Sequence, residues 1–156
     1  MKKINLEIKS YEQKYFDYLS SVMDRARRQE LKSENLEEVF LPLKDAPYLD
    51  YFLSCKIYLA FEDDVLAGFV GFRPGDLSFV YVDPSRQGRG IATTLIQKAL
   101  DELERPIRLD VFTNNKRAKA LYEKFGFKTV KTVTEKWSDK FPVIFSQDTM
   151  ELRWIP

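Results

Sequence analysis

The chain has 156 residues, with 25 lysines and arginines against 24 acidic residues, one cysteine and no histidine. This length suits a single domain with its own core, so we expect one domain over residues 1–156. A net charge of +1 gives no general attraction to nucleic acid or to membranes. The absence of histidine excludes His-based triads and His-containing metal sites, and we expect no metal.

The chain shows neither a long apolar run nor an apolar signal core near its start. We therefore expect no membrane span and a cytoplasmic location. Cys55 is the single cysteine, so no intrachain disulfide is expected, and its simplest role is a small buried side chain.

The first third of the chain changes its apolar spacing twice. Residues 3–9 alternate between apolar and polar side chains, which predicts a half-buried strand. Residues 11–31 carry apolar side chains at helical spacing, and Ser10 is the expected N-cap. Residues 33–56 contain two prolines, which favour one or two short helices.

Three consecutive antiparallel strands are predicted next. Residues 56–62, 65–73 and 76–82 are rich in β-branched and aromatic side chains. Asp63-Asp64 and Pro74-Gly75 supply the turns between them.

Helices and strands alternate in the second half of the chain. Asn114 or Asn115 is a suitable N-cap for the later helix, and Gly126 is a suitable end for it. The pattern predicts a helix over 91–103, a strand over 107–113, a helix ending before 126, and strands over 128–137 and 145–154. The fold class is therefore α/β (α+β), with a mixed sheet.

A glycine-bearing turn lies between the strand ending at Val82 and the helix beginning at Ile91. The free N–H groups and the positive dipole end of such a helix form an anion site that suits phosphate. Gly88 and Gly90 allow the backbone to approach a ligand closely. Arg86 and Arg89 add positive charge, although an ordinary strand–turn–helix connection has the same outline.

Three phosphate-binding patterns compete for this turn. A Walker A loop needs Gly-Lys, which the chain lacks. A dinucleotide fingerprint fits Gly88-x-Gly90 and a downstream Asp110, but its third position is Thr93. The remaining pattern, Gln87-x-x-Gly90-x-Ala92, resembles the signature of the GNAT superfamily of acetyl-CoA-dependent N-acetyltransferases.

A second stretch strengthens that resemblance. The spacing of Asn115, Ala118, Leu121-Tyr122 and Gly126-Phe127 is similar to the other GNAT hallmark, and it follows the first by one helix and one strand. The specific resemblance covers about residues 56–130. It implies the GNAT fold, a mixed and mostly antiparallel central sheet of about seven strands with helices on both faces.

The resemblance implies a cofactor site with no metal. Acetyl-CoA would lie where strands 76–82 and 107–113 splay apart, pairing with the backbone of Val80 and Val82 as a substitute strand. Asn115 would contact the coenzyme from the following helix. Loop amides would hold the pyrophosphate, at Gln87, Gly88, Arg89, Gly90, Ile91 and Ala92.

The resemblance also implies the chemistry, in which a neutral amine attacks the thioester directly in a ternary complex. Tyr122 matches the family position that protonates the leaving sulfur and is also expected to touch the coenzyme. Many relatives place a glutamate base where this chain has Ser78. Asp76 lies two residues earlier, on the same face if the strand alternates regularly. Asp76 would act through water or would only cap the preceding turn.

The acceptor and the partners are less defined. Residues 48–52 and the loop 137–145 are candidates for the acceptor pocket, although their aromatic side chains equally suit core packing or a dimer contact. A small-molecule or peptide amine is the expected acceptor, and a homodimer is one possible assembly. A coenzyme A-binding sensor with little catalysis is the main alternative. Acylation of charged transfer RNA would require six basic residues to share a face: Arg25, Arg27, Arg28, Lys116, Arg117 and Lys119.

Overall fold

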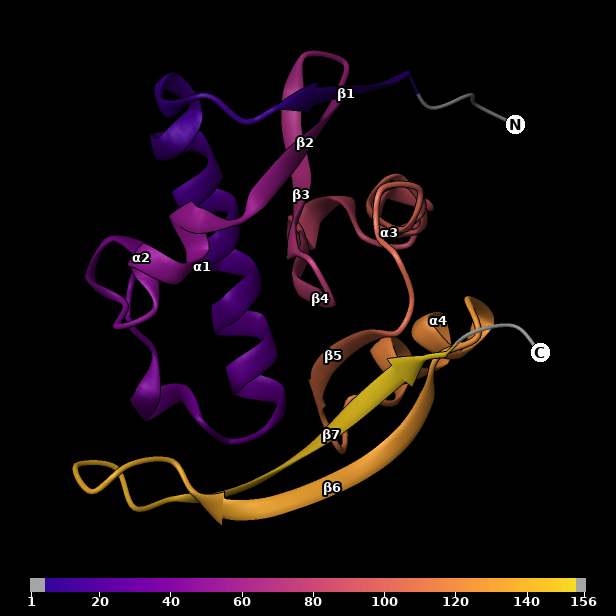
Figure 1. Cartoon of the computed structure of the whole chain (residues 1–156). Helices are drawn as coiled ribbons and strands as arrows, with labels where there is room; N and C mark the ends of the chain where they lie inside the picture. The colour runs from indigo at the N-terminus through magenta and orange to yellow at the C-terminus, as the bar shows by residue number, and fades with distance from the viewer. Residues whose placement is uncertain (1–4, 154–156) are drawn as a thin grey trace.

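A twisted central sheet organises the protein, and the computed structural model describes residues 5–153 of it (Figure 1). Alternating apolar side chains explain these strands, because one side of each buries against the helices. Within the described residues the sheet has seven strands. They are β1 (Leu6–Ser10), β2 (Lys56–Glu62), β3 (Val65–Arg73), β4 (Asp76–Val82), β5 (Ile107–Phe112), β6 (Lys128–Lys136) and β7 (Ile144–Leu152).

Helices cover both faces of the sheet, as expected. Figure 1 shows α1 and α2 on one side and α3 and α4 on the other. The bounds are α1 (Phe16–Ser33), α2 (Leu49–Ser54), α3 (Ile91–Leu100) and α4 (Lys116–Lys124). Short 3-10 turns lie at Gln13–Tyr15, Glu37–Val39, Leu43–Asp45 and Pro84–Arg86.

The sheet is weakly paired between β4 and β5. Its strand order is β1-β2-β3-β4-β5-β7-β6, and β4 and β5 form the parallel pair within it. These two strands pair only at Asp76 and Arg108, next to a bond from Arg108 N–H to the Gly75 carbonyl. Beyond that point they separate, which confirms the predicted splay. The cleft described below opens along this separation.

A separate apolar core lies on each side of the sheet. On one side, Leu95 and Ile96 of α3 are fully buried together with Phe127 and Met150. On the other side, α1 and α2 pack Leu19 and Phe52, among others, onto β2 and β3. Burial of apolar surface on both faces holds the sheet between two helical layers.

The predicted first strand and first helix need correction. Residues 3 and 4 of the predicted strand lie outside the described residues, and β1 extends to Ser10. Ser10 is therefore not the N-cap. A 3-10 turn intervenes, and α1 begins at Phe16 with no side-chain cap. The aromatic spacing after Ser10 resembles that of a continuous helix, which explains the difference.

Two later boundaries also differ. Helix α3 ends at Leu100, and Leu103 packs on the core from the turn that follows. Strand β7 begins at Ile144, and Trp154 lies outside the described residues. Gly126 has a φ of 101°, which confirms its place at the left-handed end of α4.

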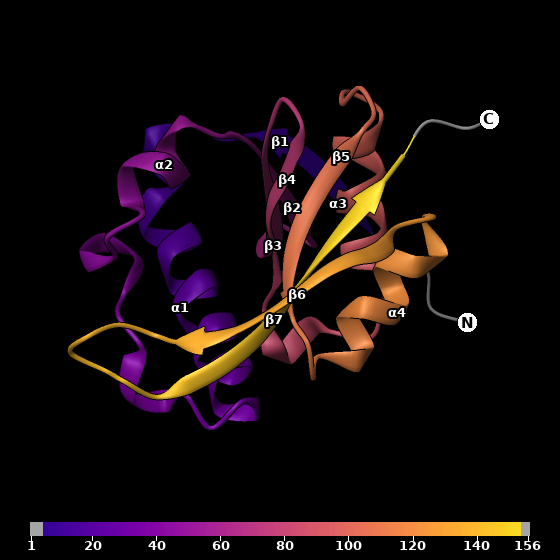
Figure 2. The same ribbon diagram turned by 60° about the horizontal axis from the view of Figure 1, so that its bottom comes forward.

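The β6–β7 hairpin reaches under the C-terminal part of α1 (Figure 2). A third apolar cluster forms there, in which Trp137 and Phe145 pack against Leu31 and Phe112. The hairpin thus brings the far edge of the sheet next to the splayed strands. In the part of the chain that the structure describes, no helix has the length and apolarity to cross a membrane.

Candidate functional site

A large cleft of about 950 Å³ follows the separation of β4 and β5. It runs from the glycine turn, between the C-terminal half of α1 and the start of α4. All but one of the expected cofactor residues line it, namely Val80, Val82, Gln87, Gly88, Gly90, Ile91, Ala92, Asn115 and Tyr122. The exception is Arg89.

Residues with free backbone N–H groups line one end of this cleft. Gly88 and Gly90 have φ values of 78° and 82°, a region that disfavours other residues. Gly90 precedes α3 directly, and the first bond of the helix runs from Thr94 N–H to the Gly90 carbonyl. The earlier N–H groups of α3 therefore stay available at the positive end of its dipole. The turn can hold an anion with backbone atoms alone.

The two arginines of the turn do not serve as free phosphate ligands. Arg86 and Arg89 both donate to Oε1 of Glu62, the last residue of β2, whose side chain is 4% exposed. Arg89 lies 2.8 Å from that oxygen and is absent from the cleft lining. The guanidinium of Arg89 is therefore directed to Glu62, and the expected contact of its backbone amide with the coenzyme stays a prediction. The arginines fix the turn to the sheet.

Loss of the Glu62 charge should loosen this turn, with a distinct pH signature. Burial alone would raise the pKa of Glu62, but Arg89 and Arg86 hold its pKa below the ordinary value. A lowered pKa adds stability above the unfolded pKa of ~4.3, and that stability disappears as pH falls through the folded value. We expect Glu62→Gln to lower the melting temperature at pH 7 and to flatten its fall below about pH 4.3. Melting curves against pH test this.

The matched control is Glu102→Gln, which removes a carboxylate that pairs with Lys56 away from the cleft. It should leave ligand-induced stabilisation unchanged, whereas Glu62→Gln should reduce it. Equal ligand effects in both variants would contradict a role for Glu62 in shaping the turn.

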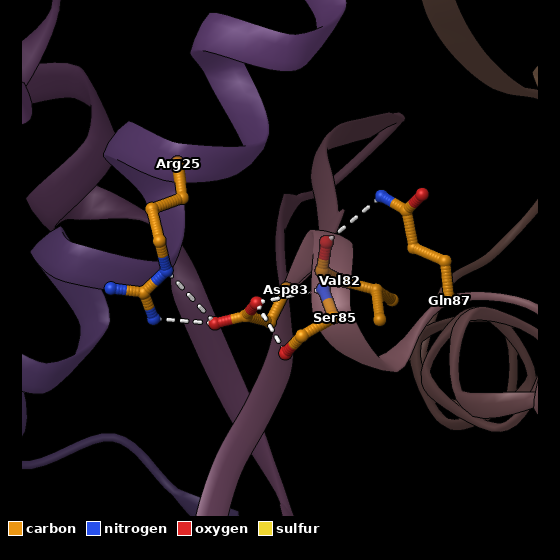
Figure 3. Close-up of polar contacts among 5 residues, drawn as sticks. All are labelled: Arg25, Val82, Asp83, Ser85 and Gln87. Atoms are coloured by element: carbon orange, nitrogen blue, oxygen red, sulfur yellow. Dashed lines mark hydrogen bonds and ion pairs between the residues drawn. The ribbon is translucent and has the colours of Figure 1, made fainter.

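A second ion pair attaches the turn to α1 (Figure 3). Arg25 donates to Oδ2 of Asp83, from Nε at 3.1 Å and also from Nη2. The other Asp83 oxygen accepts from the Ser85 N–H and hydroxyl at 3.0 and 2.9 Å. Burial would raise the pKa of Asp83, but Arg25 and Ser85 hold it below the ordinary range. Gln87 donates its amide to the Val82 carbonyl at 3.2 Å, so that carbonyl already has a partner.

The start of α4 supplies charge to the same end of the cleft. Asn115 is the N-cap, because its side-chain oxygen accepts from the Ala118 N–H at 3.1 Å. Lys116 and Arg117 line the cleft, and an Arg117 guanidinium nitrogen lies 3.7 Å from the position that a Cβ on Gly88 would take. Cations thus stand beside the glycine turn, although they belong to α4 and not to the turn itself.

Tyr122 lies on the wall of the cleft, one turn before the end of α4. Its ring packs edge-on against Phe127, with centroids 6.0 Å apart. Burial, with a smaller effect from the charge of Glu30, raises the pKa of Tyr122 well above its ordinary value. Among residues 5–153 its hydroxyl has no hydrogen-bond partner. The phenol therefore stays protonated near neutral pH and can donate into the cleft.

A smaller cavity of about 290 Å³ adjoins the cleft. Four residues belong to both cavities, namely Glu30, Tyr81, Asp110 and Val111. Trp137 and Phe145 form an aromatic wall, so part of the predicted acceptor loop does line a cavity. Residues 48–52 line neither cavity, and Phe52 is fully buried in the core.

The structure places the two candidate bases, Asp76 and Ser78, outside both cavities. Asp76 is exposed, and the Ser78 hydroxyl lies 2.8 Å from that of Tyr51. The pairing of β3 with β4 shifts at this point, leaving Ser78 without a partner in the register. This bulge breaks the regular alternation on which the expectation of a shared face depends.

Sequence reasoning missed the carboxylates that organise the site. In the sequence, Asp83 is only part of a turn, and Glu62 is only the polar end of a strand. Their partners lie on other elements: Arg25 on α1, and two arginines more than twenty residues along the chain. Glu30 resembles any polar residue of an amphipathic helix. No local pattern signals such pairs.

The six basic residues considered for a transfer RNA groove are divided between two helices. Arg25, Arg27 and Arg28 belong to α1, whereas the other three basic residues belong to α4 on the opposite side of the sheet. Lys119 pairs with the buried Asp148 at 2.5 Å. The condition set for a transfer RNA groove is therefore not met.

Comparisons with known proteins agree with this architecture. The model of the Acetyltransferase (GNAT) family matches residues 19–127. No curated protein sequence is similar enough to count as a match.

Solved structures resemble the chain over nearly its full length at low identity, which supports the fold alone. A GCN5-related N-acetyltransferase from Rhodopseudomonas palustris has 18% identity and a TM-score of 0.75, with 94% of this chain and 95% of that one covered. The protein yncA from Salmonella typhimurium, solved with its cofactor acetyl-CoA, has 17% identity and a TM-score of 0.72, covering 97% and 95%. The ribosomal-protein-S18-alanine N-acetyltransferase from Escherichia coli has 17% identity and a TM-score of 0.68, covering 97% and 96%. The family model covers most of the sheet, and the two cavities meet where β4 and β5 separate. The chain belongs to the GNAT acetyltransferase family.

Proposed function

We propose that this protein transfers an acetyl group from acetyl-CoA to a primary amine, with both substrates bound at once. The observation that carries this proposal is the pair of cavities that meet where β4 and β5 separate. The coenzyme occupies the large cleft and the amine occupies the small cavity. Acetyl-CoA supplies an activated thioester, and the chain's own residues bind, orient and move protons.

The cleft suits this coenzyme in its charge and its backbone groups. The amides of the glycine turn and the start of α3 bind the pyrophosphate. The edge of β4 at Val80 has no partner strand on its β5 side among the described residues, so it can bond an extended chain. Of the backbone contacts expected at Val82, its carbonyl is already occupied by Gln87.

Tyr122 is the proposed general acid. A thiol of ordinary acidity has a pKa of ~8.5, so a proton donor beside the leaving thiolate lowers the barrier to its departure. The buried phenol faces the cleft in its protonated form, because burial raises its pKa. It gives its proton to the sulfur and regains one from the solvent.

Arg117 is the proposed ligand for coenzyme phosphate, in place of the turn arginines. We expect Arg117→Ala to weaken coenzyme A binding about tenfold, since it removes a charge-assisted hydrogen bond. Titration calorimetry with coenzyme A measures this. Arg28→Ala, on an exposed part of α1 outside both cavities, is the matched control. Equal affinity in the Arg117 variant and the wild type would contradict the assignment.

The first test of the proposed function is the melting temperature with acetyl-CoA, coenzyme A, NADH or ATP. A ligand at about 100 times its Kd adds roughly 2.7 kcal/mol of stability. Stabilisation by acetyl-CoA and coenzyme A alone supports the coenzyme site, and release of free thiol with an amine panel then tests transfer. Stabilisation by NADH or ATP instead would contradict it.

A coenzyme A-binding module with little catalysis is the second candidate. The position of Asp76 and Ser78 outside both cavities favours it, because it removes both bases expected from the sequence. Coenzyme binding without thiol release over a broad amine panel would identify this function.

A further inference from the structure

We propose that Glu30, on α1, is the residue that receives the acceptor as an ammonium ion and takes its proton. This inference rests on the proposed acetyl transfer and names the group that prepares the amine for it. It replaces Asp76 and Ser78 of β4 with a residue from a different element.

The position of Glu30 is the first support. It is one of the four residues that line both the large cleft and the small cavity. An amine in the small cavity must pass this boundary to reach a thioester in the cleft. Glu30 and Tyr122 also interact electrostatically, because the charge of Glu30 contributes to the raised pKa of Tyr122. A proton acceptor and a proton donor thus flank the gap between the strands.

The second support is the way in which Glu30 is held. Its Oε1 accepts from the Tyr81 hydroxyl at 2.8 Å and from Arg27 Nη1. Arg27 itself lies against two aromatic rings, with its guanidinium carbon 5.7 Å from the Phe112 ring centroid and 5.8 Å from that of Trp137. Among the described residues, Oε2 of Glu30 has no hydrogen-bond partner. One oxygen is therefore fixed, and the other remains for a ligand.

The charge of the small cavity is the third support. Two carboxylates line it, Glu30 and Asp110, against the single guanidinium of Arg27. Asp110 accepts a hydrogen bond from the Thr149 hydroxyl at 2.7 Å. Negative charge in excess beside the rings of Trp137 and Phe145 favours a cation with an apolar body. The cavity of about 290 Å³ fits a compact primary amine.

The proton balance of the transfer follows from these positions. The ammonium ion gives one proton to Glu30, which passes it to solvent, and the freed lone pair forms the carbon–nitrogen bond. As the carbon–sulfur bond breaks, Tyr122 gives its proton to sulfur. The second nitrogen proton leaves to solvent, and Tyr122 regains one. The products are the amide, coenzyme A as a thiol and one net proton.

A pair of amines of nearly equal shape tests the inference. Phenethylamine is an ammonium ion near neutral pH, whereas fluorine substitution leaves β,β-difluorophenethylamine largely neutral. We expect Glu30→Gln to lower kcat/KM about 100-fold for phenethylamine, in the range of general base catalysis. The same variant should lose less than about twofold for the difluoro amine, which has no proton to give up before attack. Glu30→Asp should recover part of the loss.

Controls separate this role from a structural one and from the proposed function itself. Asp17→Asn changes an exposed acid to an amide on the same helix and should alter neither amine. Acetyl-CoA should stabilise Glu30→Gln as much as wild type in thermal melts. Equal losses for both amines, or no loss for phenethylamine, would overturn the role of Glu30. Wild-type protein that is stabilised by acetyl-CoA but acetylates neither amine would overturn the compact-amine assignment, whereas absence of stabilisation would overturn the coenzyme site.

Discussion

Replacement of Tyr122 by phenylalanine should lower kcat about 100- to 1,000-fold while leaving coenzyme binding intact. The change removes a hydroxyl that lines the cleft and that has no hydrogen bond to the described residues. The ring keeps its edge-on packing against Phe127, so the core is not disturbed. Only the hydroxyl that we propose as the proton donor for the leaving sulfur is lost. Steady-state thiol release at saturating amine measures the effect.

Two readouts make this prediction decisive. The melting shift with acetyl-CoA should match that of the wild type, because the phosphate end of the cleft is unchanged. Tyr15→Phe removes a hydroxyl from a residue that lines neither cavity and should leave kcat unchanged. Unchanged turnover in the Tyr122 variant would remove this residue from the mechanism.

Gly68→Ala should be the most damaging small change in the sheet. A Cβ at this position would lie 2.7 Å from the Tyr81 carbonyl oxygen and 3.2 Å from the Val82 Cα. Both atoms belong to the backbone of β4 and can move only if the strand moves. We expect a loss of about 1–3 kcal/mol, the usual cost of overpacking. Because the displaced strand forms the wall of the cleft, coenzyme affinity should fall as well.

The matched control is Gly71→Ala on the same strand. Its added Cβ would first meet a side-chain atom of Phe79 at 3.4 Å, which can adjust. Urea denaturation of both variants, with and without coenzyme A, compares the two positions. A milder effect at position 68 than at position 71 would show that β4 yields more easily than its contacts indicate.

The sequence predicted the fold well wherever local patterns decide it. Strands β2, β3 and β4 begin and end where alternation and turn residues placed them. The Asp63-Asp64 turn has positive φ at both residues, as a tight hairpin requires. The start of α1 was wrong because Tyr11 and Tyr15 pack on the core at helical spacing although both residues precede the helix.

The part of the site that could be predicted is the part formed by backbone groups. The residues of the glycine turn line the cleft as expected, because φ and the helix N-terminus depend on local sequence. The partner of the Arg89 side chain could not be predicted, because it is Glu62, a residue 27 positions earlier. The expectation that Asp76 shares a face with Ser78 depended on regular alternation, and a bulge interrupts it. Ion pairs and bulges arise from tertiary packing, which periodicity does not encode.

The weak pairing of β4 with β5 also affects how the two halves of the sheet are held together. The glycine turn is fastened to the half of the sheet that holds β2 and to α1, through Glu62 and Arg25. Helix α4, with its N-cap Asn115, contains Arg117 and Tyr122. An ion pair between Lys119 and Asp148 attaches this helix to β7, in the other half of the sheet. A ligand in the cleft therefore spans two halves whose backbones share a single rung of the ladder. We expect a bound ligand to connect the two halves and to reduce their motion relative to each other.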